Sequence, residues 1–194
     1  KKPLDKLNDA FFFEPLGANT LMYNPLKRFK KEQIVPTERD NYYRHQLLQG
    51  YVHDMGAAMQ DGVGGHAGVF SNANDVAKIM QMYLQKGFYG GKQYLKPETI
   101  SKFNTCYYCE KGNRRGVGFD KPQLGDAGPT CGCVSMTSFG HSGFTGTYAW
   151  ADPEQELVYV FLANRTYPKD DINLLLRQNI RTEIQRLIYE AIED

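Results

Sequence analysis

The sequence has 194 residues, of which 41% are hydrophobic and 23% are charged, the proportions of an ordinary globular domain with its own core. Its 23 basic and 22 acidic side chains give a formal net charge of +1, and the best basic run, residues 27–31, is short and followed by Glu32, so we expect no nucleic-acid partner. No apolar stretch approaches the length of about 18 residues that a membrane-spanning helix needs, so we expect no membrane span.

The first third of the chain predicts one helix and then a long polar segment. Apolar residues recur at helical spacing between Leu4 and Phe13, and the pattern ends before Pro15. Residues 18–60 are polar and rich in turn formers, which predicts an irregular segment that wraps the surface. The chain opens at Lys1 with neither an initiator Met nor a signal peptide, as expected of a mature segment or an excised piece of a longer protein.

A glycine-rich segment opens the middle third. Residues 62–70 hold four glycines within seven positions, which indicates unusual backbone angles or a close approach to another group. Apolar residues at helical spacing then predict a helix over residues 76–84, and Ser71 or Asn74 can cap it. Pro97 opens a further short helix, because proline suits the first helical turn.

The last third changes to strands followed by one helix. Residues 134–139 and 147–151 read as short strands, and the unbroken apolar run 157–163 predicts a strand buried on both faces. Apolar residues then recur at helical spacing from Asp170 to Ala191, which predicts a long amphipathic helix. Strands grouped apart from helices predict an α+β fold, with an antiparallel sheet of about three strands packed by helices.

The four cysteines lie close together as Cys106-x-x-Cys109 and Cys131-x-Cys133. Three interpretations remain open. Two Cys pairs can hold zinc, although Cys-x-Cys is tighter than most zinc knuckles, so no metal is favoured. Two disulfides fit an exported protein, and four free thiols fit a reducing compartment. We expect no other cofactor.

The segment most suited to chemistry is residues 138–147. It reads as a strand that ends in small residues around His141 and Ser142. Small residues allow a substrate to lie against a strand edge, unpaired N–H groups there can hold an oxyanion, and histidine exchanges protons near neutral pH. The same residues also fit a polar strand end with a tight turn.

The tripeptide His141-Ser142-Gly143 resembles the third motif of the β-lactamase and penicillin-binding-protein superfamily, where Lys-Thr-Gly is common. His-x-Gly occurs there in some carboxypeptidases and esterases. The chain resembles the class C-like branch in three further places, residues 64–71, 143–147 and 162–165. The resemblance covers nearly the whole chain. It implies a single, partial β-lactamase/transpeptidase-like domain over residues 1–194, with a Cys-bearing insertion at about 104–133.

The resemblance also implies roles for individual residues. His141 takes the Lys position, where it orients the substrate or polarises the catalytic groups. Ser142 would hydrogen-bond a substrate carboxylate or carbonyl, and Gly143 would permit close approach. The backbone N–H of Phe144 would be an oxyanion donor. His66 is expected near the rim of the site, with a core or capping role as the alternative.

Two motifs of the superfamily are missing. None of the five serines begins Ser-x-x-Lys, and none of the thirteen tyrosines begins Tyr-x-Asn. Because the opening residues resemble the segment just after the Tyr motif, both motifs look cut away, and we expect this chain alone to be inactive. Residues 140–144 resemble the Gly-x-Ser-x-Gly elbow, but Phe144 replaces its last glycine, and a helix would have to follow Ser142 for it to be a nucleophile.

The resemblance implies a serine hydrolase that acts on an amide or ester of a small-molecule or peptidoglycan-type substrate. The sequence is similar to domains fused behind family 3 glycoside hydrolases, the β-N-acetylhexosaminidases of Bacteroides-like bacteria. This resemblance implies that the protein resides in the periplasm or at the cell surface. The alternative is a non-catalytic binding or structural module attached to the glycosidase. The family's sheet would place a further strand beside residues 157–163, so we expect an exposed strand edge and homo-dimerisation through it.

Overall fold

The computed structural model describes residues 1–123 and 128–193. The chain forms two compact units. The first unit contains residues 1–76, 144–146 and 162–174, and the second contains residues 77–143, 147–161 and 175–194. Each unit is therefore assembled from segments that are distant in the sequence.

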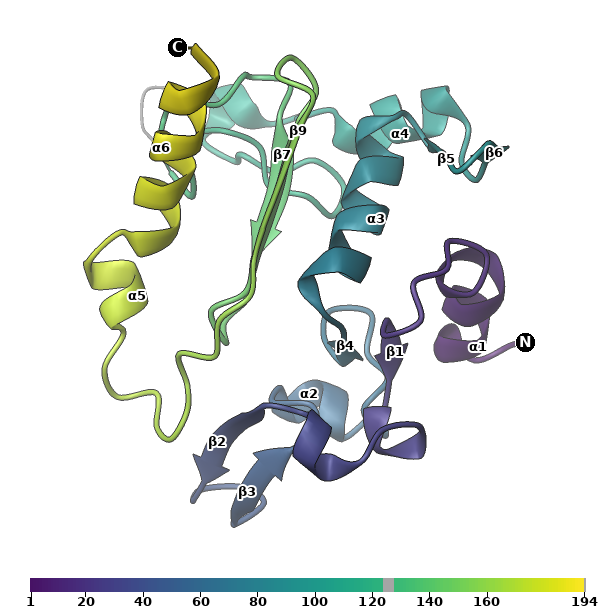
Figure 1. Cartoon of the computed structure of the whole chain (residues 1–194), viewed down its shortest axis with the longest axis vertical. Helices are drawn as coiled ribbons and strands as arrows, with labels where there is room; N and C mark the ends of the chain where they lie inside the picture. Colours follow the sequence, from purple (N-terminus) through teal and green to yellow (C-terminus); the bar gives the residue numbers. More distant parts are fainter. Residues whose placement is uncertain (124–127, 194) are drawn as a thin grey trace. The chain divides into compact units, whose positions relative to one another are not determined.

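Short elements build the first unit (Figure 1). They are α1 (Leu4–Asn8), the π-helical turn η1 (Asp9–Phe13), β1 (Met22–Tyr23), the 3₁₀ turns η2 (Pro25–Lys27) and η3 (Lys31–Gln33), β2 (Pro36–Asp40), β3 (Gln46–Gln49), α2 (Met55–Ala58) and β4 (Val69–Phe70). The antiparallel pairs are β1 with β4 and β2 with β3. Together α1 and η1 confirm the helix that was predicted over residues 4–13.

The hairpin of β2 and β3 was not predicted, and the expectation of irregular structure over residues 18–60 is wrong there. Its turn is built around the buried carboxylate of Asp40, which accepts hydrogen bonds from the backbone N–H groups of Tyr42, Tyr43 and Arg44 and from Arg44 Nε. These bonds hold the pKa of Asp40 well below its usual range against the opposing effect of burial. The buried side-chain anchor replaces the hydrophobic alternation that usually marks a hairpin.

The helix expected over residues 76–84 is α3 (Ala73–Leu84), which runs from the first unit into the second. The expected caps are wrong. Asn72 precedes the helix, and its Oδ1 accepts the Asp75 N–H at 2.9 Å, the bond of an N-cap to the third helical residue. The second unit also contains β5 (Phe88–Tyr89), β6 (Lys92–Gln93), α4 (Pro97–Asn104) and the 3₁₀ turn η4 (Cys109–Lys111). Helix α4 confirms the element predicted from Pro97.

A three-stranded antiparallel sheet organises the second unit and confirms the α+β prediction. Its strands are β7 (Phe139–Ser142), β8 (Tyr148–Asp152) and β9 (Leu157–Phe161), in that order. A strand over residues 134–139 is wrong, because β7 begins only at Phe139. The preceding residues form a turn, in which Asp152 Oδ2 accepts the Ser135 N–H at 2.8 Å and Ser135 O accepts the Ser138 N–H at 3.1 Å.

Helix α6 (Ile180–Glu193) lies along one face of this sheet (Figure 1). Tyr148, Trp150 and Tyr159 form the buried cluster of that face, and Ile184 and Ile188 of the helix pack against it. The predicted helix over residues 170–191 is interrupted, because α5 (Leu174–Arg177) ends before Asn179, whose φ is 51°. A non-glycine residue at such a φ cannot continue a right-handed helix.

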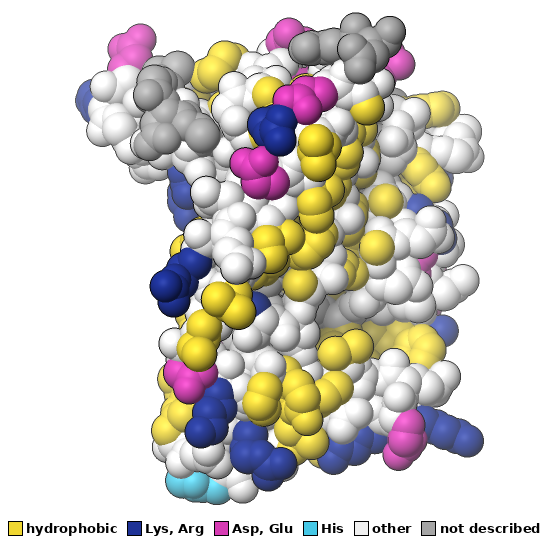
Figure 2. Space-filling view, turned by 60° about the vertical axis from the view of Figure 1, so that its left-hand side comes forward, with side chains coloured by type: hydrophobic (Ala, Val, Ile, Leu, Met, Phe, Trp, Pro, Cys, Tyr) yellow, Lys and Arg dark blue, Asp and Glu magenta, His cyan; other side chains and the backbone are white. Residues whose placement is uncertain are grey.

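Strand β9 is less buried than its apolar sequence suggested. Only Tyr159 is buried, so the expectation of burial on both faces is wrong. In the described part of the chain β9 pairs with β8 alone, which leaves its other edge without a partner strand. Hydrophobic side chains are also exposed on the side of the second unit that α6 occupies (Figure 2), and Leu187 of this helix is 55% exposed.

Gly140 is required by close packing between β7 and β8. A Cβ atom at this position would lie 2.3 Å from Ala149 O and 2.3 Å from a ring carbon of Trp150. We expect Gly140→Ala to lower the free energy of unfolding by about 1–3 kcal/mol, because a rigid backbone and a buried ring must move. Thermal unfolding followed by circular dichroism measures this loss. Gly65→Ala is the matched control, since nothing lies within 4 Å of its Cβ position. An equal loss in both variants would contradict the packing argument.

Candidate functional site

The free edge of β7 is the core of the site. The Gly140 N–H donates to Asp120 O at 3.1 Å, and the Asp120 N–H donates to Gly140 O at 2.8 Å. On the opposite side of the strand, the Gly143 N–H donates to Thr147 O at 2.8 Å. Because these groups alternate along a strand, the N–H and C=O of Ser142 point to the same edge as those of Gly140. Among the described residues, no strand covers this edge beyond Asp120. A ligand backbone can therefore pair with Ser142.

His141 has a defined hydrogen-bonding arrangement. Its Nε2 lies 3.2 Å from Arg115 Nη1, and its Nδ1 lies 2.8 Å from Ser142 O. Since a guanidinium only donates, Nε2 must accept, and Nδ1 carries the proton that Ser142 O accepts. Arg115 therefore sets the tautomer of the histidine in the motif.

A pair of arginines brings positive charge to His141. Arg114 Nη1 and Arg115 Nη1 each lie 3.2 Å from a different oxygen of the buried Asp120 carboxylate. The side chain of Arg115 is 52% exposed, so its guanidinium is fixed on one side and accessible on the other. An exposed guanidinium of this kind can bind a carboxylate. The motif reasoning missed Arg115, and the only signal for it was an adjacent arginine pair inside the Cys-bearing segment.

Lys121 holds the turn that leads into β7. Its buried Nζ donates to Thr137 O at 2.8 Å and also to Ser138 O and Asn104 Oδ1. Burial lowers the pKa of Lys121 to about 8, although the nearby Asp152 charge opposes the shift. A shallow cavity of about 310 Å³ lies beside it. Cys106 is one of the residues that line this cavity. The three acceptors of the Lys121 ammonium all belong to the protein, so Lys121 acts as a structural anchor.

Phe144 directly follows Gly143 and belongs to the first unit. In the part of the chain that the structure describes, its N–H makes no hydrogen bond, as an oxyanion donor awaiting a ligand requires. Its side chain is 61% exposed. His53 and Arg165 contact the ring. Arg165 lies in the segment 162–165 that the resemblance had already singled out, whereas sequence reasoning did not identify His53 as a site residue.

His66 also lies in the first unit, where it contacts the start of α2. Its Nε2 is 2.9 Å from Asp54 Oδ1, and the same oxygen accepts the Ala57 N–H at 2.7 Å as the N-cap of that helix. The Ala57 amide and His66 together hold the pKa of Asp54 below its usual value. His66 thus supports a cap, which was the alternative expected for it, and a substrate-binding role stays a prediction.

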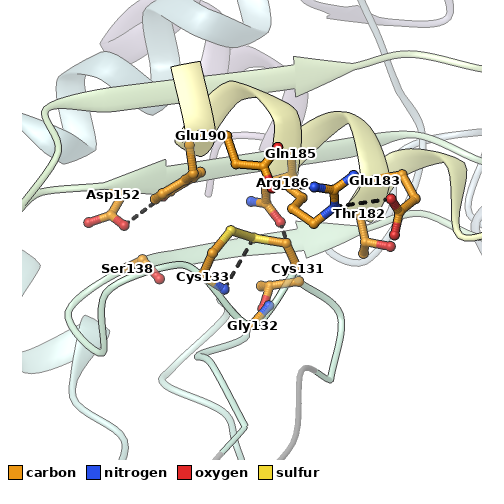
Figure 3. Close-up of a disulfide and its surroundings, with 12 residues drawn as sticks. Cys131, Gly132, Cys133, Ser138, Asp152, Thr182, Glu183, Gln185, Arg186 and Glu190 are labelled. Atoms are coloured by element: carbon orange, nitrogen blue, oxygen red, sulfur yellow. Dashed lines mark hydrogen bonds and ion pairs between the residues drawn. A yellow bond between two sulfur atoms is a disulfide. The ribbon is translucent and has the colours of Figure 1, made fainter. Parts of the chain in front are cut away.

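The four cysteines form two disulfides, Cys106–Cys109 and Cys131–Cys133, so the disulfide interpretation is the one the structure contains. The second disulfide lies beside α6 (Figure 3), where Gln185 Oε1 accepts the Cys131 N–H at 3.0 Å. No cluster of three or more His, Cys, Asp or Glu side chains suited to a metal is found within residues 1–123 and 128–193. Over the same residues, no helix has the length and apolarity to cross a membrane.

Comparison with known proteins gives both sequence and structural matches. Residues 2–181 match the family described as Beta-lactamase. A protein of Escherichia coli K12 named "Putative D-alanyl-D-alanine carboxypeptidase" is 36% identical over 179 residues, which cover 86% of this chain and 41% of that protein. The chain thus spans less than half the length of the curated relatives it matches.

Solved structures share the fold. The LovD6 mutant of simvastatin synthase from Aspergillus terreus aligns with a TM-score of 0.64 at 18% identity, over 98% of this chain and 52% of that one. A β-lactamase from Mycobacterium bovis aligns with a TM-score of 0.57 at 18% identity, over 97% of this chain and 54% of that one. At such identities the likeness shows the fold alone.

Proposed function

The chain belongs to the β-lactamase family, and we propose that it carries the third motif of a hydrolase that cleaves the C-terminal D-alanyl-D-alanine amide of a peptidoglycan-type peptide. The observation that carries this proposal is the half-exposed guanidinium of Arg115 beside His141, at a strand edge where the backbone N–H of Ser142 points away from β8. The name of the Escherichia coli relative supports the same substrate class.

The strand edge suits an extended peptide. Pairing of its backbone with Ser142 would place the peptide antiparallel or parallel to β7, as in other strand-addition complexes. Ser142 Oγ and the Arg115 guanidinium would hold the terminal carboxylate. When a carboxylate binds Arg115, it competes with His141 Nε2 for the same donor, and the ring is released to exchange a proton with the reacting groups.

The reaction requires a nucleophile that these residues do not supply. In acyl transfer of this class a serine hydroxyl attacks the amide carbon, the C–N bond breaks, and D-alanine leaves after taking a proton. Water then hydrolyses the acyl ester. We assign the nucleophile to a Ser-x-x-Lys sequence outside these 194 residues, because none of the five serines fits that motif. Ser142 is followed by strand β8, whereas the nucleophile elbow needs a helix. The N–H of Phe144 would stabilise the oxyanion.

The experiment is release of D-alanine from an N-acyl-peptide ending in D-alanyl-D-alanine, measured with the full-length protein that contains this chain. We expect release by the full-length protein and none by the 194-residue chain. Tight binding without release by the full-length protein would replace the proposal with the alternative of a non-catalytic module.

A cell-envelope location is proposed with this function. Periplasmic or cell-surface residence is supported by the disulfides Cys106–Cys109 and Cys131–Cys133, which persist in oxidising compartments. Fusion to a family 3 β-N-acetylhexosaminidase is proposed from the sequence resemblance alone. Intact mass and peptide mapping of the natural protein test the fusion, and a protein without glycosidase sequence would refute it.

We also propose that this chain forms a homo-dimer through β9. Its outer edge offers unpaired backbone groups next to partly exposed apolar side chains, and such edges are templates for pairing with another strand. Multi-angle light scattering should give a mass that rises toward twice the chain's 22.1 kDa as concentration increases. Val160→Pro removes a backbone donor in this strand and should return the chain to a monomer. Val35→Pro, at an exposed position outside the strands, is the control. A wild-type monomer at high concentration would contradict the proposal.

A further inference from the structure

Arg165 fixes the backbone around Phe144 at two successive carbonyls. Its Nε donates to Phe144 O at 2.7 Å, and its backbone N–H donates to Thr145 O at 2.9 Å. All three residues belong to the first unit, although 21 positions separate Phe144 from Arg165 in the sequence. A loop carbonyl held by a charged donor has less freedom to rotate than one held by water.

The ring of Phe144 is held as well, in spite of its exposure. The guanidinium carbon of Arg165 lies 4.3 Å from the ring centroid, a close cation–π contact. The imidazole of His53 stacks on the ring with centroids 5.5 Å apart and an interplanar angle of 26°. Two side chains from separate segments thus contact this one ring.

His53 is itself anchored to a buried carboxylate. Its Nε2 lies 2.8 Å from Glu38 Oε2, and Glu38 on β2 is only 3% exposed. The hydroxyl of Tyr42 donates to the same oxygen at 3.0 Å. Burial, together with the hydrogen bond to Glu38, raises the pKa of Tyr42 to about 12, so this donor keeps its proton at neutral pH. The stacking partner of Phe144 is therefore held by a hydrogen-bonded network, which limits the positions that its ring can take.

We propose that Arg165 and the Glu38–His53 pair are positioning residues, which hold the unbonded Phe144 N–H in place as the oxyanion donor. The proposal rests on the proposed function for the identity of the bound group, a carbonyl oxygen that becomes an oxyanion. Oxyanion stabilisation depends on donors that do not reorganise during the reaction. Glu38 lies on β2, His53 follows β3 and Arg165 follows β9. Together they restrict the ring of Phe144 and the backbone that directly follows its N–H.

Backbone ¹⁵N relaxation of the 194-residue chain tests the positioning directly. We expect the order parameter of the Phe144 N–H to fall from about 0.85 to below about 0.6 in Arg165→Ala, and by a smaller amount in His53→Ala. Arg165→Lys should restore most of the order, because an ammonium can still donate to Phe144 O. Arg186→Ala is the control, since within residues 1–123 and 128–193 Arg186 forms ion pairs with Glu183 and Glu190 of its own helix. An unchanged order parameter in Arg165→Ala would overturn the proposal.

Kinetics of the full-length protein separate this inference from the proposed function. Arg165→Ala should lower kcat about 10-fold to 100-fold with KM nearly unchanged, less than the loss of about 100-fold to 1,000-fold expected when an oxyanion donor is removed outright. A loosened Phe144 with an unchanged kcat would overturn the positioning role. Absence of turnover in the wild-type protein would refute the proposed function, while the relaxation result alone would still decide whether Arg165 orders Phe144.

Discussion

Replacing Asp152 by alanine should lower the free energy of unfolding of the chain by about 3–5 kcal/mol, because it removes the acceptor of a buried network. The carboxylate is 1% exposed. It accepts hydrogen bonds from Ser135 N–H at 2.8 Å, Ser135 Oγ at 2.5 Å, Tyr189 OH at 2.6 Å and Glu154 N–H at 3.1 Å. These contacts join the end of β8 to the turn before β7 and to α6, so the loss affects the whole sheet.

The same carboxylate makes stability depend on pH. Burial raises the pKa of Asp152, but the hydrogen bonds from Ser135, Tyr189 and Glu154 outweigh it and hold the pKa below the ordinary value of 3.8. A group whose pKa is lower in the folded state stabilises fully above its unfolded pKa. The contribution of Asp152 should therefore be present above about pH 4 and be lost as the pH falls through the folded-state value.

Urea unfolding followed by Trp150 fluorescence measures both effects. Trp150 is the single tryptophan and lies buried in β8, so its emission reports on this sheet. The control is Glu110→Ala, which removes an exposed carboxylate from η4 and should leave stability within about 0.5 kcal/mol. A comparable stability of Asp152→Ala and the control, or no difference in their dependence on acid pH, would contradict the role of the network.

Replacing Arg115 by glutamine in the full-length protein should lower kcat/KM for a peptide ending in D-alanyl-D-alanine by about 10-fold to 100-fold. A charge-assisted contact between a guanidinium and the terminal carboxylate contributes about 1.5–3 kcal/mol. The same variant should cleave an ester substrate without a free carboxylate at nearly the wild-type rate, because that substrate never uses the contact and the glutamine amide can still donate a hydrogen bond to His141 Nε2.

Arg114→Gln is the matched control for this experiment. Arg114 pairs with the same Asp120 carboxylate at 3.2 Å, but the contact to His141 Nε2 is made by Arg115. The control should therefore retain the preference for the carboxylate-terminated peptide. Equal losses on both substrates in Arg115→Gln would indicate a structural role for Arg115 and refute carboxylate recognition.

Periodicity predicted the elements that bury a continuous apolar face. Helix α3 and strand β8 follow from hydrophobic spacing, because their packing partners require it. The hairpin β2–β3 has no such pattern, since its sequences Pro-Thr-Glu-Arg-Asp and Gln-Leu-Leu-Gln are mostly polar. Its turn depends on the buried Asp40, and a side chain that accepts several backbone N–H groups leaves no periodic signal.

The residues of the candidate site also differ in how far the sequence could predict them. His141, Ser142 and Gly143 are contiguous, so a motif can identify them. Arg115 reaches His141 from 26 positions earlier, and His53 reaches Phe144 from a segment far upstream. Contacts of this kind are created by the fold, and a single sequence contains no signal that pairs such residues.

Intact mass spectrometry after incubation with benzylpenicillin tests whether this chain is part of a serine hydrolase whose nucleophile lies outside its 194 residues, with the full-length protein and the chain measured side by side. Penicillin acylates the serine of a working β-lactamase-type site, so we expect one covalent adduct on the full-length protein, mapped to a serine of a Ser-x-x-Lys sequence, and none on the chain. An unmodified full-length protein, or an adduct on Ser142 of the isolated chain, would contradict the assignment of the nucleophile to a Ser-x-x-Lys sequence outside the chain.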